Sequence, residues 1–291
     1  MSLNRVKADR VDGAASVCPG RLQRWVEAIS YPRSFRGQPR ANRQAGEWVA
    51  DLLSSFGYSV KMQGDYRNVV AYPRGHRGPI ALAGAHYDSV PTTPGADDNG
   101  SGLAVLLETA RALANEDCVG FVAFNAEEDG LVGSSDFVAD HQLHGLHEIR
   151  GIHVMEMVGF TATGAGSQRS PAGLPIQLPE DGDFIGVVGN DRSVNFLKTV
   201  EFSARKMNDG PRIVSLGLRI NPERWLPDIL RSDHAPFWRA DIPALMWSDT
   251  AEFRNPNYHR STDTPDTLDY LFMERVCRLL INSLQAFPPP L

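Results

Sequence analysis

The chain has 291 residues, of which 42% are hydrophobic and 22% are charged, and its formal net charge at pH 7 is −6. This length suits one large α/β domain, and the apolar content is enough for a core that needs no disulfides. The acidic balance excludes nucleic acid as a partner, because binding phosphates requires a basic surface.

Helices and strands are expected to alternate along the first half of the chain. Helical spacing covers 21–29 and 45–56, and short strands are expected at 58–60 and 68–72. The nearly continuous apolar run at 79–85 predicts a central strand that is covered on both faces. A helix at 102–113 and another central strand at 119–125 follow.

The same alternation continues to the end of the chain. We expect a helix from 134 to 140, a buried strand from 149 to 158, a helix from 194 to 207, an apolar strand from 242 to 247 and a closing helix from 268 to 286. This order predicts a three-layer α/β/α sandwich around a largely parallel, mixed central sheet. Residues 1–291 are interpreted as one domain, with an N-terminal extension over 1–20 and a tail over 287–291.

Cysteine usage and the N-terminus bear on the compartment. Cys18, Cys118 and Cys277 are far apart and match neither a disulfide framework nor a cysteine-based zinc site. No apolar run is long enough to cross a bilayer, and the first 20 residues lack the apolar centre of a signal peptide. The simplest interpretation is a cytoplasmic protein without membrane contact; a secreted or periplasmic protein whose signal has been removed would look the same.

Acidic and imidazole side chains follow the carboxyl ends of the apolar runs. In sheets of this kind ligands bind outside those ends, so His86, Glu127, Glu128 and Glu156 should gather at one rim. A lone carboxylate such as Glu156 in an apolar strand is stable only when it is paired or bound to a metal ion. The pattern therefore points to a metal site at this rim.

Two short motifs indicate which residues of such a site could bind a metal ion and which could orient a ligand or act as a general base. His86 and Asp88 face the same way on a strand, as is needed when a metal-binding imidazole donates its other N–H to a carboxylate. Glu127 and Glu128 repel each other, so one can reach a metal ion while the other acts as a general base. Taken singly, the first motif could be a surface ion pair and the second a solvated acidic turn.

Two further segments remain ambiguous on their residues alone. Asp97 and Asp98 lie on a glycine-rich loop before a helix, where a helix cap would account for one carboxylate but not for two. Ser101 does not match the turn that presents a nucleophilic serine. His234 and His259 are both candidates for a second imidazole ligand, and their spacing does not choose between them.

The order of these motifs resembles that of the di-zinc aminopeptidase family, whose relatives include secreted bacterial aminopeptidases, glutamate carboxypeptidase and glutaminyl cyclase. The matching segments are AHYDSV, PGADDNGSG, FNAEEDGLVGS, MEMVG, RSDHAPF and YHRSTDTPDTL, which lie between about residues 79 and 270. The resemblance implies a single zinc-peptidase catalytic domain, a peptide substrate and two zinc ions, which other divalent cations could replace.

The resemblance also implies roles for the matching residues. Five side chains would bind the metal ions: His86, Asp98, Glu128, Glu156 and His259. Asp98 would bridge the two ions, Glu127 would be the general base and Asp88 would orient His86. His234 would then be a residue of the site wall.

Two details of the resemblance concern the backbone and one substitution. The peptide bond between Asp97 and Asp98 would have the unusual cis form that is frequent in this family. Glu156 is a departure, since aspartate is commoner at this position in the best-known relatives. The longer side chain could still reach a metal ion with altered geometry.

We therefore expect a metal-dependent exopeptidase, most simply an aminopeptidase that uses a di-zinc-bound hydroxide with Glu127 as general base. The substrate amine would lie near Glu127 and Glu156, and the segments 160–185 and 219–230 would form the side-chain pocket. Three different functions would also fit: a carboxypeptidase or dipeptidase, in which Arg231 would hold a carboxylate, a glutaminyl-cyclase-like enzyme, and a metal-free receptor-like protein. The cyclase branch works with one zinc ion and lacks the full DDNGSG pattern, and the complete set of ligand positions disfavours the receptor. The sequence does not indicate an oligomeric state.

Overall fold

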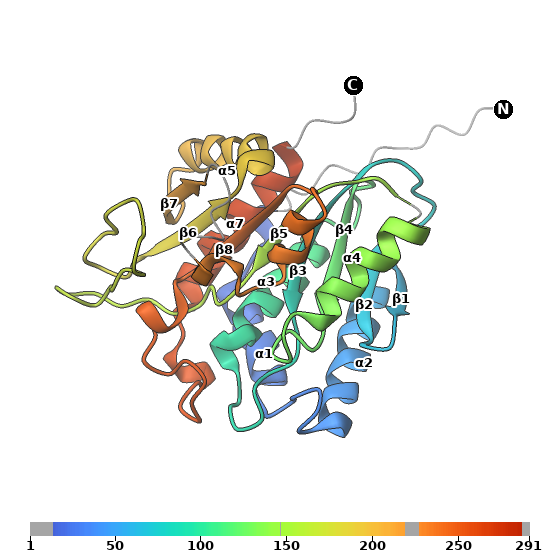
Figure 1. The fold of residues 1–291 in the computed structure, drawn as a ribbon, viewed down its shortest axis with the longest axis horizontal. Coiled ribbons are helices and arrows are strands. Elements are labelled where there is room, and N and C mark those ends of the chain that lie inside the picture. The colour runs from blue at the N-terminus through green and yellow to red at the C-terminus, as the bar shows by residue number, and fades with distance from the viewer. Residues whose placement is uncertain (1–13, 146, 219–226, 287–291) are drawn as a thin grey trace.

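An apolar, mostly parallel sheet forms the centre of the protein. The computed structural model describes residues 14–145, 147–218 and 227–286, and its sheet has the strand order β1-β2-β4-β3-β5-β8-β6-β7 (Figure 1). The bounds are β1 Ser59–Gln63, β2 Asn68–Tyr72, β3 Ile80–His86, β4 Val119–Phe124, β5 Ile149–Met155, β6 Phe184–Gly189, β7 Arg212–Gly217 and β8 Ala244–Ser248. The central strands β4, β3, β5 and β8 are mutually parallel, whereas β2 and β6 join them in antiparallel register.

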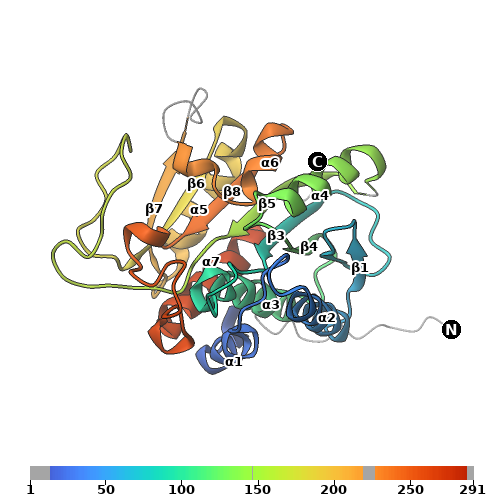
Figure 2. The ribbon, with the colours of Figure 1, turned by 60° about the horizontal axis from the view of Figure 1, so that its bottom comes forward.

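Helices cover both faces of this sheet. They are α1 Pro19–Ile29, α2 Pro39–Ser55, α3 Gly102–Ala112, α4 Val132–His144, α5 Val194–Lys206, α6 His234–Arg239 and α7 Tyr270–Ala286. Side chains of α1, α2, α3, α5 and α7 pack in one core, and those of α4 and α6 pack in a second core on the opposite face (Figure 2). Because both faces are covered, every residue of β3 and β4 is buried. The predicted three-layer α/β/α sandwich is confirmed.

Several element boundaries differ from the predictions. Helix α2 begins six residues before the predicted start at 45, with Pro39 in its first turn, where proline costs no hydrogen bond. Strand β5 ends at Met155 instead of 158, because Met157 has a positive φ of 50°. As a result Glu156 lies just beyond the strand, at its carboxyl end.

Three elements, β6, β7 and α6, were not predicted. Strand β6 contains two glycines, and β7 lies at the edge of the sheet with Leu216 as its one buried residue. Helix α6 has six residues and contains Pro236, so it is too short to show a helical period. In each case tertiary packing defines an element whose local pattern is weak.

The packed body includes part of the predicted N-terminal extension. Ala14 and Val17 are buried against the core, and α1 already begins at Pro19. The predicted tail over 287–291 lies outside the described residues. Among the helices that are described, none has the length and apolarity needed to cross a bilayer.

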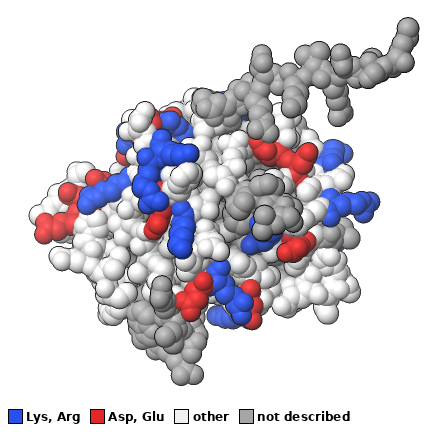
Figure 3. All heavy atoms as spheres, turned by 90° about the horizontal axis from the view of Figure 1, so that it is seen from above, with Lys and Arg blue, Asp and Glu red and all other residues white. Residues whose placement is uncertain are grey.

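Exposed charges on the surface are of both signs. Pairs such as Arg278–Asp209 and Arg212–Asp183 join acidic and basic side chains at the surface. Figure 3 shows Lys and Arg interspersed with Asp and Glu on the face seen from above. Exposed pairs of this kind contribute little to stability. Buried ionisable groups have a larger effect on the stability of the fold.

A buried histidine in β5 couples the fold to pH. The ring of His153 stacks on Phe196 at a centroid distance of 4.8 Å, and its Nδ1 accepts a hydrogen bond from Trp247 Nε1 at 3.2 Å. Burial lowers the pKa of His153 to about 3, because the charged form would lose its hydration. The folded protein therefore holds this imidazole neutral.

We predict that His153→Asn reduces the acid sensitivity of the fold. Between pH 6.5 and about 3 the unfolded chain binds a proton at His153 that the folded chain does not, so stability falls as the pH falls. Removing this group should lower the slope by up to about 1.4 kcal/mol per pH unit. Urea unfolding of metal-free protein at several pH values measures the slope. The exposed His144→Asn is the control, and an unchanged slope for His153→Asn would contradict the prediction.

Candidate metal centre

The predicted ligands converge at the carboxyl ends of the parallel strands. His86 is the last residue of β3, Glu156 directly follows β5, and Glu128 lies four residues beyond β4. Asp98 lies in the turn Ala96–Ser101 that leads into α3, where its own backbone is not helical, and His259 lies on the loop between β8 and α7. Five residues from distant parts of the sequence thus meet at one rim of the sheet. The position rule for parallel sheets predicted this for His86, Glu128 and Glu156, whereas Asp98 and His259 were expected from the family resemblance.

The five side chains form two groups that share Asp98. One group contains His86, Asp98 and Glu156, and the other contains Asp98, Glu128 and His259; in each, one candidate ligand atom per residue lies within 4.8 Å of the others. Asp98 Oδ1 is 3.4 Å from His86 Nε2, and Asp98 Oδ2 is 3.1 Å from His259 Nε2. Each carboxylate oxygen of Asp98 therefore faces a different group.

Each group is completed by a glutamate. Glu156 Oε2 is 3.5 Å from His86 Nε2, and Glu128 Oε2 is 3.4 Å from His259 Nε2. These separations are longer than ordinary hydrogen bonds. Imidazole nitrogen and carboxylate oxygen are ligands that zinc accepts, and three protein ligands leave the open position that a catalytic site needs.

Glu127 and Asp88 lie beside the two groups without belonging to them. Glu127 is 9% exposed, and its Oε2 is 4.0 Å from His86 Nε2. Asp88 Oδ1 is 3.4 Å from His86 Nδ1, and the Asp88 carboxylate accepts hydrogen bonds from the backbone N–H groups of Glu127 and Glu128 at 3.2 and 3.3 Å. Asp88 therefore connects the end of β3 to the loop after β4.

The site concentrates negative charge in a buried volume. Burial and the charge of Asp98 raise the pKa of Glu128 to about 7, and burial with the charge of Glu156 nearby raises the pKa of Glu127 well above its usual range. Burial acts the same way on Asp98, but the neighbouring imidazoles of His259 and His86 outweigh it and lower its pKa. Two imidazoles do not balance the charge of four carboxylates, whereas two divalent cations would.

Several ligand atoms are also buried without a hydrogen bond. Both ring nitrogens of His86 and Oε1 of Glu128 lack a hydrogen-bond partner among the described residues. Such atoms are costly in a protein interior unless something binds them. Metal coordination would satisfy His86 Nε2, which faces Asp98 and Glu156, whereas His86 Nδ1 faces Asp88.

Two predictions from the sequence were wrong. The cis peptide bond joins Asp98 to Asn99, not Asp97 to Asp98. His234 does not line the site: it is the first residue of α6, where its ring packs edge-on against Trp238 at 4.5 Å and its Nε2 lies 2.6 Å from the carbonyl oxygen of Ile229. The helix start turns this side chain into the core beneath the site.

Three neighbouring side chains make contacts around the ligands that the sequence did not predict. Ser232 Oγ donates a hydrogen bond to Glu156 Oε2 at 2.7 Å. The ring of Tyr258 stacks on His259 at 3.8 Å, and Arg231 Nη2 donates to the Tyr258 hydroxyl at 2.9 Å. All three lie in the matching segments RSDHAPF and YHRSTDTPDTL, but only Arg231 was given a role beforehand, as a residue that would hold a substrate carboxylate.

Comparison with known proteins identifies the family. The model of peptidase family M28 matches residues 68–176 and 214–284, a range that contains all five candidate ligands. The chain belongs to peptidase family M28.

Sequence relatives of this M28 member differ in how much of their length it covers. The uncharacterized protein YfbL of Escherichia coli (strain K12) is 34% identical over 288 residues, which cover 91% of this chain and 87% of that protein. The probable lipoprotein aminopeptidase LpqL of Mycobacterium tuberculosis is 32% identical over 84% of the chain, and the aminopeptidase YwaD of Bacillus subtilis is 52% identical over 68%. The chain spans 48% and 38% of those two proteins.

Solved structures share the fold of this M28 member. The LapA aminopeptidase of Legionella pneumophila superimposes with a TM-score of 0.72 at 18% identity, covering 94% of this chain and 73% of that one. Glutaminyl cyclase of Porphyromonas gingivalis superimposes with a TM-score of 0.69 at 21% identity, covering 92% and 98%. Because the fold serves both an aminopeptidase and a cyclase, only the site can distinguish between these activities.

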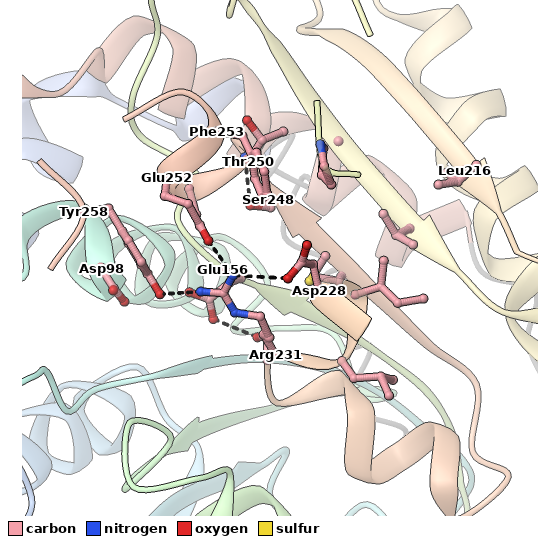
Figure 4. A pocket seen from close by; sticks show the side chains of 18 of the residues that line it. Asp98, Glu156, Leu216, Asp228, Arg231, Ser248, Thr250, Glu252, Phe253 and Tyr258 are labelled. Atoms are coloured by element: carbon pink, nitrogen blue, oxygen red, sulfur yellow. Dashed lines mark hydrogen bonds and ion pairs between the residues drawn. The ribbon is translucent and has the colours of Figure 1, made fainter. Parts of the chain in front are cut away.

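A cavity of about 530 Å³ opens from the carboxylate cluster of this M28 peptidase. Asp98, Glu156 and Tyr258 lie at one end, and the guanidinium of Arg231 lies between them and the remainder of the cavity (Figure 4). The lining also includes the apolar residues Leu174, Leu178, Phe184, Val188, Leu216 and Met246, of which Leu216 lies away from Asp98 and Tyr258 (Figure 4). The predicted pocket segments contribute residues 171–184 and 228–230, whereas 219–226 lie outside the described residues.

We predict that zinc raises the thermal stability of chelator-treated protein and that Asp98→Asn abolishes most of this gain. A cation that binds only the folded state stabilises it by about 2.7 kcal/mol at 100 times its dissociation constant, and the variant removes the carboxylate that both groups share. Calorimetry with and without zinc measures the gain. Asp117→Asn, at an exposed acid beyond the opposite end of β4 from Glu128, is the control. A full gain in Asp98→Asn would mean that zinc binds elsewhere.

Proposed function

We propose that this M28 peptidase is a di-zinc aminopeptidase that removes single residues from free peptide N-termini, with Glu127 as the general base. One observation carries the proposal: two three-ligand groups share Asp98, and one further carboxylate, Glu127, lies beside them. When bound, the zinc ions would act as Lewis acids and would lower the pKa of a coordinated water toward about 7.

The position of Glu127 supports its role in moving protons. Its carboxylate lines the cavity but belongs to neither ligand group, so it remains available to substrate and water. It would accept a proton from the attacking water and deliver it to the leaving amine. The hydrogen bonds from the backbone of Glu127 and Glu128 to Asp88 hold this loop in place, which keeps the base and the ligand on their separate sides.

The charges at the cavity favour a substrate with a free amine over one with a free carboxylate. Glu127 and Glu156 present negative charge at the metal end, which attracts an ammonium group. Arg231 is the basic residue that would hold the substrate carboxylate in a carboxypeptidase. It forms ion pairs with Glu252 and with Asp228, and it donates a hydrogen bond to the Tyr258 hydroxyl. Its charge is already compensated, which disfavours a carboxypeptidase.

The second ligand group argues against a cyclase and against a metal-free receptor. A cyclase that works with one zinc ion would leave Glu128 and His259 without a function, and a metal-free receptor would leave buried carboxylates uncompensated. The apolar lining of the cavity favours a large aliphatic or aromatic side chain at the N-terminal residue of the substrate.

We predict that Glu127→Ala keeps its metal ions but loses on the order of 10²- to 10⁴-fold in kcat, the usual effect of removing a general base. His86→Ala and Glu128→Ala should instead lower the zinc content, because each removes a ligand. Elemental analysis and turnover of leucine 4-nitroanilide measure the two effects separately. Loss of zinc in Glu127→Ala with normal activity per remaining ion would reverse the assignment of roles.

We further predict that hydrolysis requires a free amine. Leucine 4-nitroanilide should be cleaved, and N-acetyl-leucine 4-nitroanilide should not, because the acetyl group removes the positive charge that Glu127 and Glu156 would bind. A blocked peptide with a free C-terminus, with release of its last residue followed by mass spectrometry, tests for carboxypeptidase activity. Cleavage of that peptide in preference to leucine 4-nitroanilide would refute the aminopeptidase proposal.

A further inference from the structure

A buried arginine lies beneath the loops that carry the candidate ligands. Arg33 is in the connection between α1 and α2, before the first residue matched by the family model, and its side chain is fully buried. Within the described part of the chain, its guanidinium donates hydrogen bonds to four main-chain carbonyl oxygens. An interior cation held by backbone groups fixes the positions of the segments that supply them.

The guanidinium joins two ligand-bearing segments. Its Nε donates to the carbonyl oxygen of Tyr87 at 2.7 Å, and Tyr87 lies between His86 and Asp88. Its Nη1 and Nη2 donate to the carbonyl oxygens of residues 94 and 95 at 2.6 and 3.0 Å, just before the turn that carries Asp98. A single planar group therefore sets the distance between the end of β3 and the Asp98 turn.

Gly95 makes this close approach possible. Its φ is +64°, and a Cβ at this position would lie 2.5 Å from the Asp98 carbonyl oxygen and 3.0 Å from Arg33 Nη1. A side chain would therefore displace the guanidinium or the turn. The absence of a side chain at Gly95 leaves room for the guanidinium of Arg33.

Asn42 on α2 extends the connection to the third ligand-bearing loop. Its Nδ2 donates to the Arg33 carbonyl oxygen at 2.9 Å, and its side chain exchanges two hydrogen bonds with Asn125, at 2.8 and 3.0 Å. Asn125 directly follows β4 and lies two residues before Glu127. Asn42 and Asn125 are both buried, so water does not compete for these bonds.

We propose that Arg33, together with Asn42, is a positioning residue that sets the spacing of the metal ligands on three separate loops. The proposal rests on the metal centre proposed above. Lysine could keep the positive charge but presents its donors from one point, so it cannot reproduce a fork that reaches carbonyl groups on two segments. A purely structural Arg33 would contribute to the stability of the fold and leave metal affinity unchanged.

Zinc affinity of the metal-stripped protein tests this inference. Competition with a chromogenic chelator gives the dissociation constant for wild type, Arg33→Met, Arg33→Lys and Asn42→Ala. We expect Arg33→Met to weaken zinc binding on the order of 10- to 100-fold, the usual range for residues that orient ligands, and Arg33→Lys to weaken it less. If Arg33→Met does not fold, Arg33→Lys and Asn42→Ala decide, and both must bind zinc more weakly than wild type.

Arg21→Met is the matched control. Arg21 is also a partly buried arginine of the N-terminal segment, but its guanidinium pairs with Glu108 and with the Ser16 carbonyl oxygen, away from the turn that carries Asp98. Its loss should lower the thermal stability of the metal-free protein and leave the zinc affinity within about 2-fold of wild type. Equal weakening in Arg21→Met and Arg33→Met would show that the effect follows from general stability and would overturn the inference.

The remaining outcomes separate the two proposals. Wild-type protein that binds zinc, alongside folded Arg33 and Asn42 variants that bind it equally well, would overturn the positioning role and leave the proposed function intact. Wild-type protein that binds no zinc would overturn the proposed function and this inference with it. His86→Ala, which removes a candidate ligand itself, marks the affinity expected when one ligand is lost.

Discussion

The two oxygens of the Asp98 carboxylate face in different directions, and the organisation of the site depends on this one side chain. One oxygen faces His86 and the other faces His259. Every other candidate ligand must therefore be placed relative to Asp98, although the residues come from four separate connections of the fold. Small shifts of the turn Ala96–Ser101 would disturb both groups at once.

The surroundings of Asp98 hold that turn from several sides. The Asp263 carboxylate accepts hydrogen bonds from the backbone N–H groups of Asp97 and Asp98 at 2.8 and 3.1 Å. The Asp97 carboxylate in turn accepts from Gly159 and from Asn255 Nδ2. These buried polar contacts join the turn to segments far away in the sequence and fix its position.

Burying an ionised carboxylate costs free energy, and several buried acids of this protein lie together at the candidate site. Desolvation and mutual repulsion raise the pKa of Glu127 and Glu128, which shows that the protein interior resists their ionised forms. Buried carboxylates held this close together favour the binding of a cation, because the cation offsets their charge. The same low-dielectric surroundings would strengthen the interaction of the site with a charged amine.

The sequence by itself determined the fold class and the rim of the sheet at which the candidate residues meet. Apolar runs such as 79–85 identify strands covered on both faces, and polar residues directly after them must lie at the carboxyl edge of a parallel sheet. For that reason His86, Glu127, Glu128 and Glu156 could be placed together in advance. Edge strand β7 and the six-residue helix α6 could not, because their local patterns are weak.

Only the tertiary structure decided how those residues are held. His234 and His259 have similar local contexts, yet the start of α6 turns His234 into the core while the loop after β8 brings His259 to Asp98. The contacts of Arg33 go to carbonyl oxygens, which every residue has, so no residue pattern reveals them. Side-chain types and their order specify which chemistry is available, whereas backbone groups brought together by folding specify its geometry.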